Sequence, residues 1–287
     1  MNEFGYSAPH TLDEAVTLLA NNPGARVLAG GQSLLVEPNR SRLAASLLVD
    51  LRKIEGLNSV ERQQDGSVKI GSMTTLTAIA RNGLIRETYP ALAEAAQMTG
   101  DAQERNRATV GGNLADADPA ADLPALMLAL DAQVQVVSPK GLRTIPVDGL
   151  ITGANKTALR SDDVITAVTL PAAAGGTGTA YERATHPATL HALCGVAASV
   201  TLAGDGSVSG CRVAITGAVD HAARLHSVES ALTGKVPGPA ALAAAASHAG
   251  DGLTFRTDLF ASADYRAHLA GVLAERALAL AVRRAGR

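Results

Sequence analysis

Aromatic residues and cysteines are scarce in this chain of 287 residues. Phe, Trp and Tyr make up 2% of it, Trp is absent, and Cys194 and Cys211 are the two cysteines. Two thiols are too few to ligate an iron–sulfur cluster or a structural zinc without help from another chain. With so few cysteines, and without a secretory signal or a membrane-length apolar run, we expect a cytoplasmic protein, in which the two thiols would be reduced and buried. Ala, Leu and Val must form the core, within a hydrophobic content of 47%.

An excess of positive charge is also missing. The chain has 25 basic and 27 acidic residues, a net charge of -2, which argues against nucleic acid as its main partner. No apolar run reaches the roughly 20 residues of a membrane span. The first residues have neither a basic start nor an apolar stretch, so no secretory signal is expected.

Several catalytic motifs do not occur. No G-x-G-x-x-G follows a predicted strand, and no Walker-type G-x-x-x-x-G-K-[ST] is present, which disfavours a Rossmann or P-loop nucleotide site. The histidines of the pairs His186/His191 and His221/His226 are five residues apart and lack the H-E-x-x-H pattern. No metal ligands, Ser-His-Asp set or paired carboxylates stand out, so the catalytic residues are unknown from sequence.

Composition divides the chain near residues 171–178, a small, uncharged and flexible stretch. Before it, short strand and helix patterns are mixed. Thr11 is a candidate N-cap with Glu14 at capping-box spacing, and residues 99–121 are expected to form a loop. After it, two long strand patterns surround a turn at Gly204-Asp205-Gly206, a strong hairpin signal. The two cysteines fall on these two strands, so they could be neighbours.

Two loops containing a glycine pair are the main functional signal, Ala29-Gly30-Gly31-Gln32-Ser33 and Thr109-Val110-Gly111-Gly112-Asn113. Because glycine lacks Cβ and allows positive φ, neighbouring backbone amides can converge on one anion. Two such loops suit a diphosphate, and the Ser33 hydroxyl and Asn113 amide can add donors. The alternative is that both are ordinary tight turns.

At these loops the sequence resembles the FAD-binding subunits of the molybdenum hydroxylases. The similarity covers nearly the whole chain. Its most specific part is Arg105 to Ala115 with the continuation Asp116 to Pro124, and Ala29 to Leu35 resembles the family's first flavin motif. Ala180-Tyr181-Glu182-Arg183 and Asp264-Tyr265-Arg266 resemble stretches of its C-terminal domain.

The resemblance implies an α+β fold. Residues 1–175 would form a two-subdomain FAD-binding domain of the vanillyl-alcohol-oxidase-like (PCMH) type, divided at about residue 55. Residues 179–287 would form a smaller α/β C-terminal domain of the CO-dehydrogenase flavoprotein type. The partners implied are a small [2Fe-2S] subunit and a large molybdopterin subunit, in a dimer of heterotrimers. The chain would pass electrons from those clusters through FAD to an external acceptor.

The resemblance also implies a set of cofactor-binding residues. Asp118 would approach the ribityl or ribose hydroxyls, Tyr181 would lie near the isoalloxazine, and Arg183 could stabilise negative charge on reduced flavin. For Tyr181 the alternative is a core aromatic, and for Arg183 a solvated charge. Gln32 predicts non-covalent FAD, because covalent flavoproteins of the wider fold often have a linking His there. The full set is Ala29, Gly30, Gly31, Gln32, Ser33, Leu34, Thr109, Val110, Gly111, Gly112, Asn113, Asp118, Tyr181 and Arg183.

Some questions stay open at this level. A free-standing FAD-dependent dehydrogenase or oxidase on the same scaffold is an alternative, and so is a non-enzymatic binding module. The sequence does not identify the substrate, which a large partner subunit would select, or the electron acceptor. It also leaves the roles of Arg105, Arg107 and Asp116 unassigned.

Overall fold

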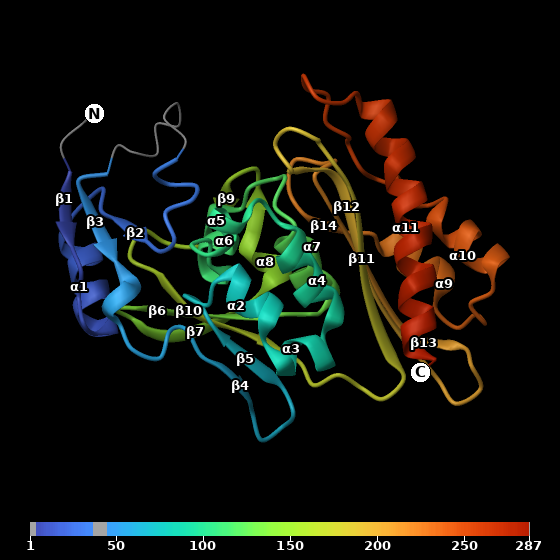
Figure 1. The fold of residues 1–287 in the computed structure, drawn as a ribbon, viewed down its shortest axis with the longest axis horizontal. Helices are drawn as coiled ribbons and strands as arrows, with labels where there is room; N and C mark the ends of the chain where they lie inside the picture. Colours follow the sequence, from blue (N-terminus) through green and yellow to red (C-terminus); the bar gives the residue numbers. More distant parts are fainter. Residues whose placement is uncertain (1–3, 37–44, 287) are drawn as a thin grey trace.

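The computed structural model describes residues 4–36 and 45–286. The ends of the two predicted domains, residues 1–3 and 287, lie outside that range. The three larger sheets of the described residues follow one another along the long axis of the molecule (Figure 1). The first is a small parallel sheet, the second a five-stranded antiparallel sheet, and the third a four-stranded sheet covered by helices. The first two belong to the N-terminal part of the chain and the third to the C-terminal part.

The first unit is built on helix α1 (Leu12–Asn21). Its predicted N-cap is confirmed, because Thr11 Oγ1 accepts a hydrogen bond from Glu14 N at 3.2 Å. The Glu14 carboxylate accepts from His10 N at 2.8 Å, one residue before the position that a capping box would use. The helix packs beside a parallel sheet of order β1-β3-β2, which is followed by a short 3-10 helix η2. Their bounds are β1 (Gly5–Ser7), β2 (Arg26–Leu28), β3 (Leu47–Asp50) and η2 (Leu51–Lys53).

The second unit is an antiparallel sheet of order β4-β5-β10-β6-β7 with helices packed on it. Its strands are β4 (Val60–Arg62), β5 (Val68–Gly71), β6 (Gln133–Ser138), β7 (Gly141–Pro146) and β10 (Val164–Leu170). Its helices are α2 (Leu76–Arg81), α3 (Gly83–Thr88), α4 (Pro90–Met98), α5 (Ala102–Arg105), α6 (Val110–Asp116), α7 (Leu123–Ala129) and α8 (Val147–Leu150). A two-stranded hairpin joins β8 (Ile151–Gly153) and β9 (Lys156–Thr157).

The prediction that residues 99–121 form a loop is wrong in two places, because α5 and α6 lie inside that span. Both helices are too short to show a helical hydrophobic period, and a glycine pair weakens the local helix propensity of α6. Side-chain caps compensate: Asp101 Oδ1 accepts from Gln103 N and Glu104 N, and Thr109 Oγ1 accepts from Gly112 N.

The third unit is a sheet of order β11-β12-β13-β14 in which every pair is antiparallel. The predicted hairpin around residues 204–206 is confirmed as β12 and β13. The domain mixes helices and strands as expected, but its strands follow one another as hairpins rather than as parallel strands with helical crossovers. The bounds are β11 (Thr177–Thr185), β12 (Ala192–Leu202), β13 (Val208–Thr216), β14 (Ala223–Arg224), α9 (His226–Leu232), α10 (Pro239–Ala246) and α11 (Ala263–Ala285).

The two cysteines are not neighbours, contrary to the expectation from the hairpin. Cys194 pairs with Ala184 across β11 and β12, whereas Cys211 pairs with Val200 across β12 and β13. Cys194 is therefore six residues along β12 from the partner of Cys211, about 20 Å in an extended strand. Both thiols are free, and burial raises the pKa of each to about 12.

The C-terminal sheet is fixed to the second unit by apolar packing and by polar contacts. Tyr181, Ala197 and Ala214 belong to the same buried cluster as α7 and the five-stranded sheet. Arg284 near the end of α11 donates to Glu94 on α4 at 2.6 Å, and Thr216 Oγ1 donates to the carbonyl oxygens of Pro119 and Ala121. The chain between α6 and α7 is therefore held by the third unit. Among the described residues, no helix is long and apolar enough to cross a membrane.

Candidate functional site

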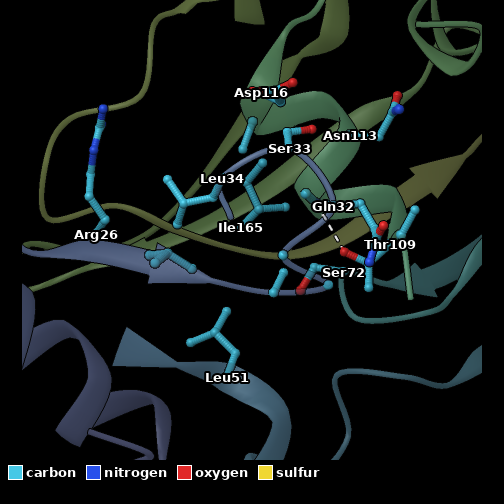
Figure 2. A pocket seen from close by; sticks show the side chains of 18 of the residues that line it. Arg26, Gln32, Ser33, Leu34, Leu51, Ser72, Thr109, Asn113, Asp116 and Ile165 are labelled. Atoms are coloured by element: carbon cyan, nitrogen blue, oxygen red, sulfur yellow. Dashed lines mark hydrogen bonds between the residues drawn. The ribbon is translucent and has the colours of Figure 1, made fainter. Parts of the chain in front are cut away.

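The two glycine loops lie side by side. A Cβ atom built on Gly30 would lie 2.6 Å from the carbonyl carbon of Arg107 and would overlap the oxygen of that carbonyl group. A Cβ on Gly112 would lie 3.6 Å from the Cβ of Ala29. Figure 2 shows Gln32 and Ser33 of the first loop beside Thr109 and Asn113 of the second. The structure thus brings together two segments that are about 80 residues apart in sequence.

The first loop leaves its backbone amides available. Gly31 has φ of +78°, the left-handed conformation that favours glycine. A hydrogen bond from Leu35 N to Gly31 O at 3.1 Å closes the turn. Within residues 4–36 and 45–286, the amides of residues 30–34 donate to no protein acceptor. This loop therefore has the unpaired donors that an anionic ligand would need.

The second loop differs from the expectation that it too would offer free amides. Gly111 N donates to Ser72 O at 2.9 Å, Gly112 N donates to Thr109 Oγ1 at 3.1 Å, and Asn113 N donates to Thr109 O at 2.9 Å. These bonds form because the loop is also the first turn of α6, capped by Thr109. The backbone amides of this loop are used within the fold, so the loop would contact a ligand through its side chains.

The two loops line a single cavity of about 470 Å³, within the usual range for ligand-binding pockets. The other walls come from β2, from the end of β5, and from the segment between β8 and β10. Asp116 at the end of α6 and Glu104 of α5 also face it. Sequence reasoning did not identify several of its polar residues, which follow no motif and meet through tertiary packing alone: Arg26, Ser72, Asn155, Thr157, Arg160 and Asp163.

Three side-chain oxygens at this cavity are buried and have no hydrogen-bond partner among the described residues. They are Ser72 Oγ, Asn113 Oδ1 and Asp163 Oδ1. Buried polar atoms are nearly always paired in native proteins, so each of these points to a ligand or ordered water. Ser72 and Asn113 lie beside the first loop (Figure 2). A polar ligand with hydrogen-bonding groups therefore fits the site.

Asn155 connects the far wall of the cavity to α6. Its side-chain amide donates to Asp116 O at 3.1 Å, and its backbone amide donates to Ala117 O at 2.9 Å. Asn155 and Ala117 both have the left-handed backbone conformation, with φ of 53° and 50°. The turn between β8 and β9 thus caps the C-terminal end of α6 beside the cavity.

The two arginines before the second loop have different positions. Arg105 Nη1 donates to Gly100 O at 2.7 Å and to Thr99 O at 3.1 Å, so it braces the chain between α4 and α5. Arg107 lines a second cavity of about 240 Å³, which Ala29 and Gly30 also line. Arg52 and Asn58 also line that cavity.

Tyr181 and Arg183 do not line the cavity at the glycine loops. The Tyr181 hydroxyl donates to Asp122 Oδ1 at 2.5 Å, and Arg183 Nη1 donates to Asp122 Oδ2 at 2.7 Å. Tyr181 is 3% exposed, so its ring has no free face, and burial raises the pKa of its hydroxyl well above the ordinary value. Arg183 is an ion-paired group and not a solvated charge. Their contact with a flavin stays a prediction.

Asp118 also lies outside the residues that line the cavity. Its Oδ1 accepts a hydrogen bond from Ala120 N at 2.8 Å and so shapes the turn that follows α6. Residues 119–121 connect Asp118 to Asp122, which immediately precedes α7. Asp118 and Asp122 therefore link the end of α6 to the C-terminal sheet, and a role of Asp118 toward ligand hydroxyls stays a prediction.

Comparison with known proteins gives the family. Residues 2–173 match the model for the FAD binding domain in molybdopterin dehydrogenase, and residues 179–281 match that for the CO dehydrogenase flavoprotein C-terminal domain. The chain is 36% identical to the carbon monoxide dehydrogenase medium chain of Hydrogenophaga pseudoflava, over 96% of both chains. It is 35% identical to the 6-hydroxypseudooxynicotine dehydrogenase complex subunit alpha of Paenarthrobacter nicotinovorans, over 98% of this chain and 95% of that one.

A solved structure agrees with these matches. The carbon monoxide dehydrogenase from Hydrogenophaga pseudoflava that lacks the Mo-pyranopterin moiety of the molybdenum cofactor superposes with a TM-score of 0.94, covering 99% of this chain and 98% of that chain at 36% identity. Fold and site together define a flavoprotein subunit of an oxidoreductase. The chain belongs to the family of FAD-binding subunits of the molybdenum hydroxylases, which confirms the resemblance seen in the sequence.

Proposed function

We propose that this chain passes electrons from the [2Fe-2S] clusters of a partner subunit through non-covalently bound FAD to an external acceptor. The observation that supports this most directly is the pairing of the two glycine loops at one cavity, where three buried side-chain oxygens have no partner among the described residues. When bound, FAD supplies the redox chemistry, and the protein supplies binding, orientation and electrostatics.

The amides of residues 30–34 would hold the diphosphate, because they line the cavity and donate to no acceptor within the part of the chain that the structure describes. Ser33 and Ser72 would add hydroxyl donors, and Asn113 would add its side-chain amide. Gln32 faces the same cavity, and its amide has no nucleophilic ring nitrogen that could bond to a flavin. These features support a non-covalent site.

The flavin end of the ligand would lie toward Glu104 and the C-terminal sheet. Glu104 faces the cavity and its carboxylate packs on Gly100. Arg105 braces Gly100, and Arg183 donates to the carbonyl oxygen of Met98, so residues 98–104 connect the cavity to the Asp122 cluster. Arg183 would be a cation at that end and would stabilise negative charge there.

The partners proposed are a small subunit with two [2Fe-2S] clusters and a large molybdopterin subunit, assembled as a dimer of heterotrimers. The names of the relatives, a medium chain and a subunit of a dehydrogenase complex, support a multi-subunit assembly. Those relatives are named for different substrates, which fits a chain that leaves substrate choice to another subunit. We also assign the N-terminal domain to the vanillyl-alcohol-oxidase-like (PCMH) type, and we keep the cytoplasm as the expected location.

Two measurements test the proposal. The purified chain should be yellow, or should become so when FAD is added, and heating should release FAD. Mixed with its reduced [2Fe-2S] subunit, the FAD-loaded chain should lose its flavin absorbance and regain it when an acceptor is added. A chain that stays colourless with FAD, or a bound flavin that the reduced clusters never bleach, would overturn the proposal.

A further inference from the structure

Asp163 is a buried carboxylate with one satisfied oxygen and one unsatisfied oxygen. It precedes β10 and lines the cavity, and its side chain is 0% exposed. Oδ2 accepts hydrogen bonds from Arg160 N at 2.6 Å and from Arg143 Nη2. Oδ1 has no partner among the described residues, and neither has Arg143 Nε. The guanidinium therefore grips this carboxylate by one nitrogen, not by the two-pronged pairing that would satisfy both oxygens.

An unpaired carboxylate oxygen requires a donor, because leaving it buried without one is costly. The diphosphate of a dinucleotide has only acceptors and negative charge. The donors in FAD are the hydroxyl groups of the ribose and the ribityl chain, the adenine amino group, and the imide N–H of the flavin. Asp163 can therefore recognise only a part of the ligand that lies away from the phosphates.

The direction from the phosphates to Asp163 follows from strand β10. Ser72 lies against Gly111 of the second loop and donates its amide to Thr166 O at 3.0 Å. Asp163 precedes Thr166 by three residues, about 10 Å in an extended strand. The other direction along β10 leads through Leu170 to residues 171–176 and the C-terminal sheet. Asp163 thus lies on the side away from that sheet.

Neighbouring residues confirm this placement. Val164 packs into the buried cluster formed by α1 and β3 of the first unit. Arg26 of β2 also lines the cavity, and Figure 2 shows it on the opposite side of the view from Thr109 and Asn113. The cavity thus extends from the glycine loops toward the N-terminal unit, and Asp163 is a buried acceptor in that extension.

We infer that Asp163 recognises the adenosine half of FAD by accepting, at Oδ1, a hydrogen bond from a ribose hydroxyl or from the adenine amino group. This rests on the proposed function, which places the flavin half toward the C-terminal sheet. It makes Asp163 a specificity-determining residue that favours FAD over FMN, since FMN has no adenosine half. Arg143 and Arg160 N hold the carboxylate in place through its other oxygen.

The first test changes the ligand and leaves the protein intact. Flavin-free full-length chain is titrated with FAD, with FAD analogues containing 2′-deoxyadenosine, 3′-deoxyadenosine or hypoxanthine in place of adenine, and with FMN and ADP. We expect FAD to bind more tightly than FMN, and at least one of the three analogues to lose about 10- to 100-fold in affinity, the range for a hydrogen bond to a charged group. The weakened analogue identifies the group that donates to Oδ1.

The second test changes the carboxylate. Asp163→Asn should weaken FAD and ADP by about 10-fold or more and leave FMN within about twofold. Asp162→Asn is the matched control, because it removes the same charge one residue away at a position that does not line the cavity. Thermal unfolding of each flavin-free variant shows whether it is folded, and the analogue titrations decide the matter if Asp163→Asn is not.

The outcomes distinguish a failure of the proposed function from a failure of the inference about Asp163. If the wild-type chain binds neither FAD nor ADP, the proposed function fails. If it binds FAD, yet all three analogues bind within twofold of FAD, the inference about Asp163 is wrong and the function stands. Weaker FMN binding with unchanged ADP binding in Asp163→Asn would place Asp163 at the flavin half and would equally overturn the inference.

Discussion

Gly30 packs directly on the backbone of Arg107, with no room for a side chain between the first glycine loop and the segment that leads into the second. This contact joins the N-terminal parallel unit to the five-stranded unit at the point where both face one cavity. The geometry of the site is therefore set by backbone against backbone, which leaves little freedom for the two loops to move apart.

Gly30→Ala should separate the loops. The added methyl group would overlap the carbonyl group of Arg107, so we expect a loss of about 1–3 kcal/mol in the free energy of unfolding, as for overpacked interiors, and a loss of FAD affinity of at least tenfold. Gly83→Ala is the control, since a Cβ there meets nothing within 4 Å. Urea unfolding and FAD titration check both variants. Unchanged FAD affinity in Gly30→Ala would mean that the close contact of the loops is not needed for binding.

Ser72→Ala and Asn113→Ala should weaken the FAD-bound form of the protein but not the flavin-free form. Ser72 Oγ and Asn113 Oδ1 have no partner among the described residues, so removing either should leave the flavin-free chain as stable as before, or slightly more stable. The FAD-bound form should lose affinity by about 3- to 10-fold for each, the value of one neutral hydrogen bond of roughly 1 kcal/mol. Thermal unfolding with and without FAD measures this difference. A flavin-free chain weakened as much as the FAD-bound one would assign these groups to the fold alone.

Much of the architecture could be predicted because it is written in local patterns. The cap at Thr11, the hairpin around Asp205 and the long final helix each depend on residues close in sequence. The glycine pairs likewise indicated where a ligand site would form. Their being in contact, through Gly30 and Arg107, could only be expected through the family resemblance, because it depends on how two units dock.

The rest of the site was beyond sequence reasoning for physical reasons. Ser72 and Asp163 follow no motif, and their importance comes from side-chain oxygens that find no partner among residues 4–36 and 45–286 once the sheet has formed. The amides of Gly111 and Gly112 were expected to be free, but helix α6 starts there and uses them. Tyr181 was expected beside a flavin ring, and its burial against Asp122 appears only once the C-terminal sheet is docked.

The ion pair between Arg183 and Asp122 should matter strongly for stability, because both side chains are at least nine-tenths buried, with 9% and 3% exposed. Asp122→Ala leaves the guanidinium without its carboxylate and should cost about 3–5 kcal/mol in the free energy of unfolding. The double variant Asp122→Leu/Arg183→Met should recover part of that loss, since no charge is left unpaired, although the Tyr181 hydroxyl still lacks its acceptor. Denaturant unfolding of the single and double variants checks this, and a double variant no more stable than Asp122→Ala would contradict it.

Stability should fall in acid partly through Asp50. Burial acts to raise the pKa of this carboxyl, but hydrogen bonds from Arg52 and Tyr6 outweigh it and hold the pKa below the ordinary value of 3.8. A group with a lowered folded pKa stabilises the fold above its unfolded pKa, and this contribution is lost as the pH falls through the folded value. Urea midpoints measured from pH 6 to pH 2 should therefore fall below about pH 4, and Asp50→Asn should flatten that decline. Glu61→Gln, at an exposed position on β4, is the control and should leave the slope as in the wild type.

The two thiols should be inert in the folded chain. At pH 8 a thiol with a pKa of about 12 is almost entirely protonated, so alkylation by iodoacetamide should be at least about 100-fold slower than in urea. Mass spectrometry of the alkylated chain gives the rate at Cys194 and at Cys211 separately. Rapid labelling of Cys194 under native conditions would contradict its place in the core of the C-terminal sheet.

The account depends above all on a flavin dinucleotide binding where the two glycine loops meet, and thermal unfolding of the flavin-free chain in increasing FAD tests it most directly. With FAD at 100 times its Kd, the folded state should gain about 2.7 kcal/mol, a rise in Tm of roughly 5 °C or more for a chain of this size. At the same FAD concentration, Gly30→Ala should reduce that rise to about half or less, as a tenfold or greater loss of affinity requires, while Gly83→Ala keeps it. A wild-type Tm that does not change with FAD, or a rise that Gly30→Ala leaves intact, would contradict the account.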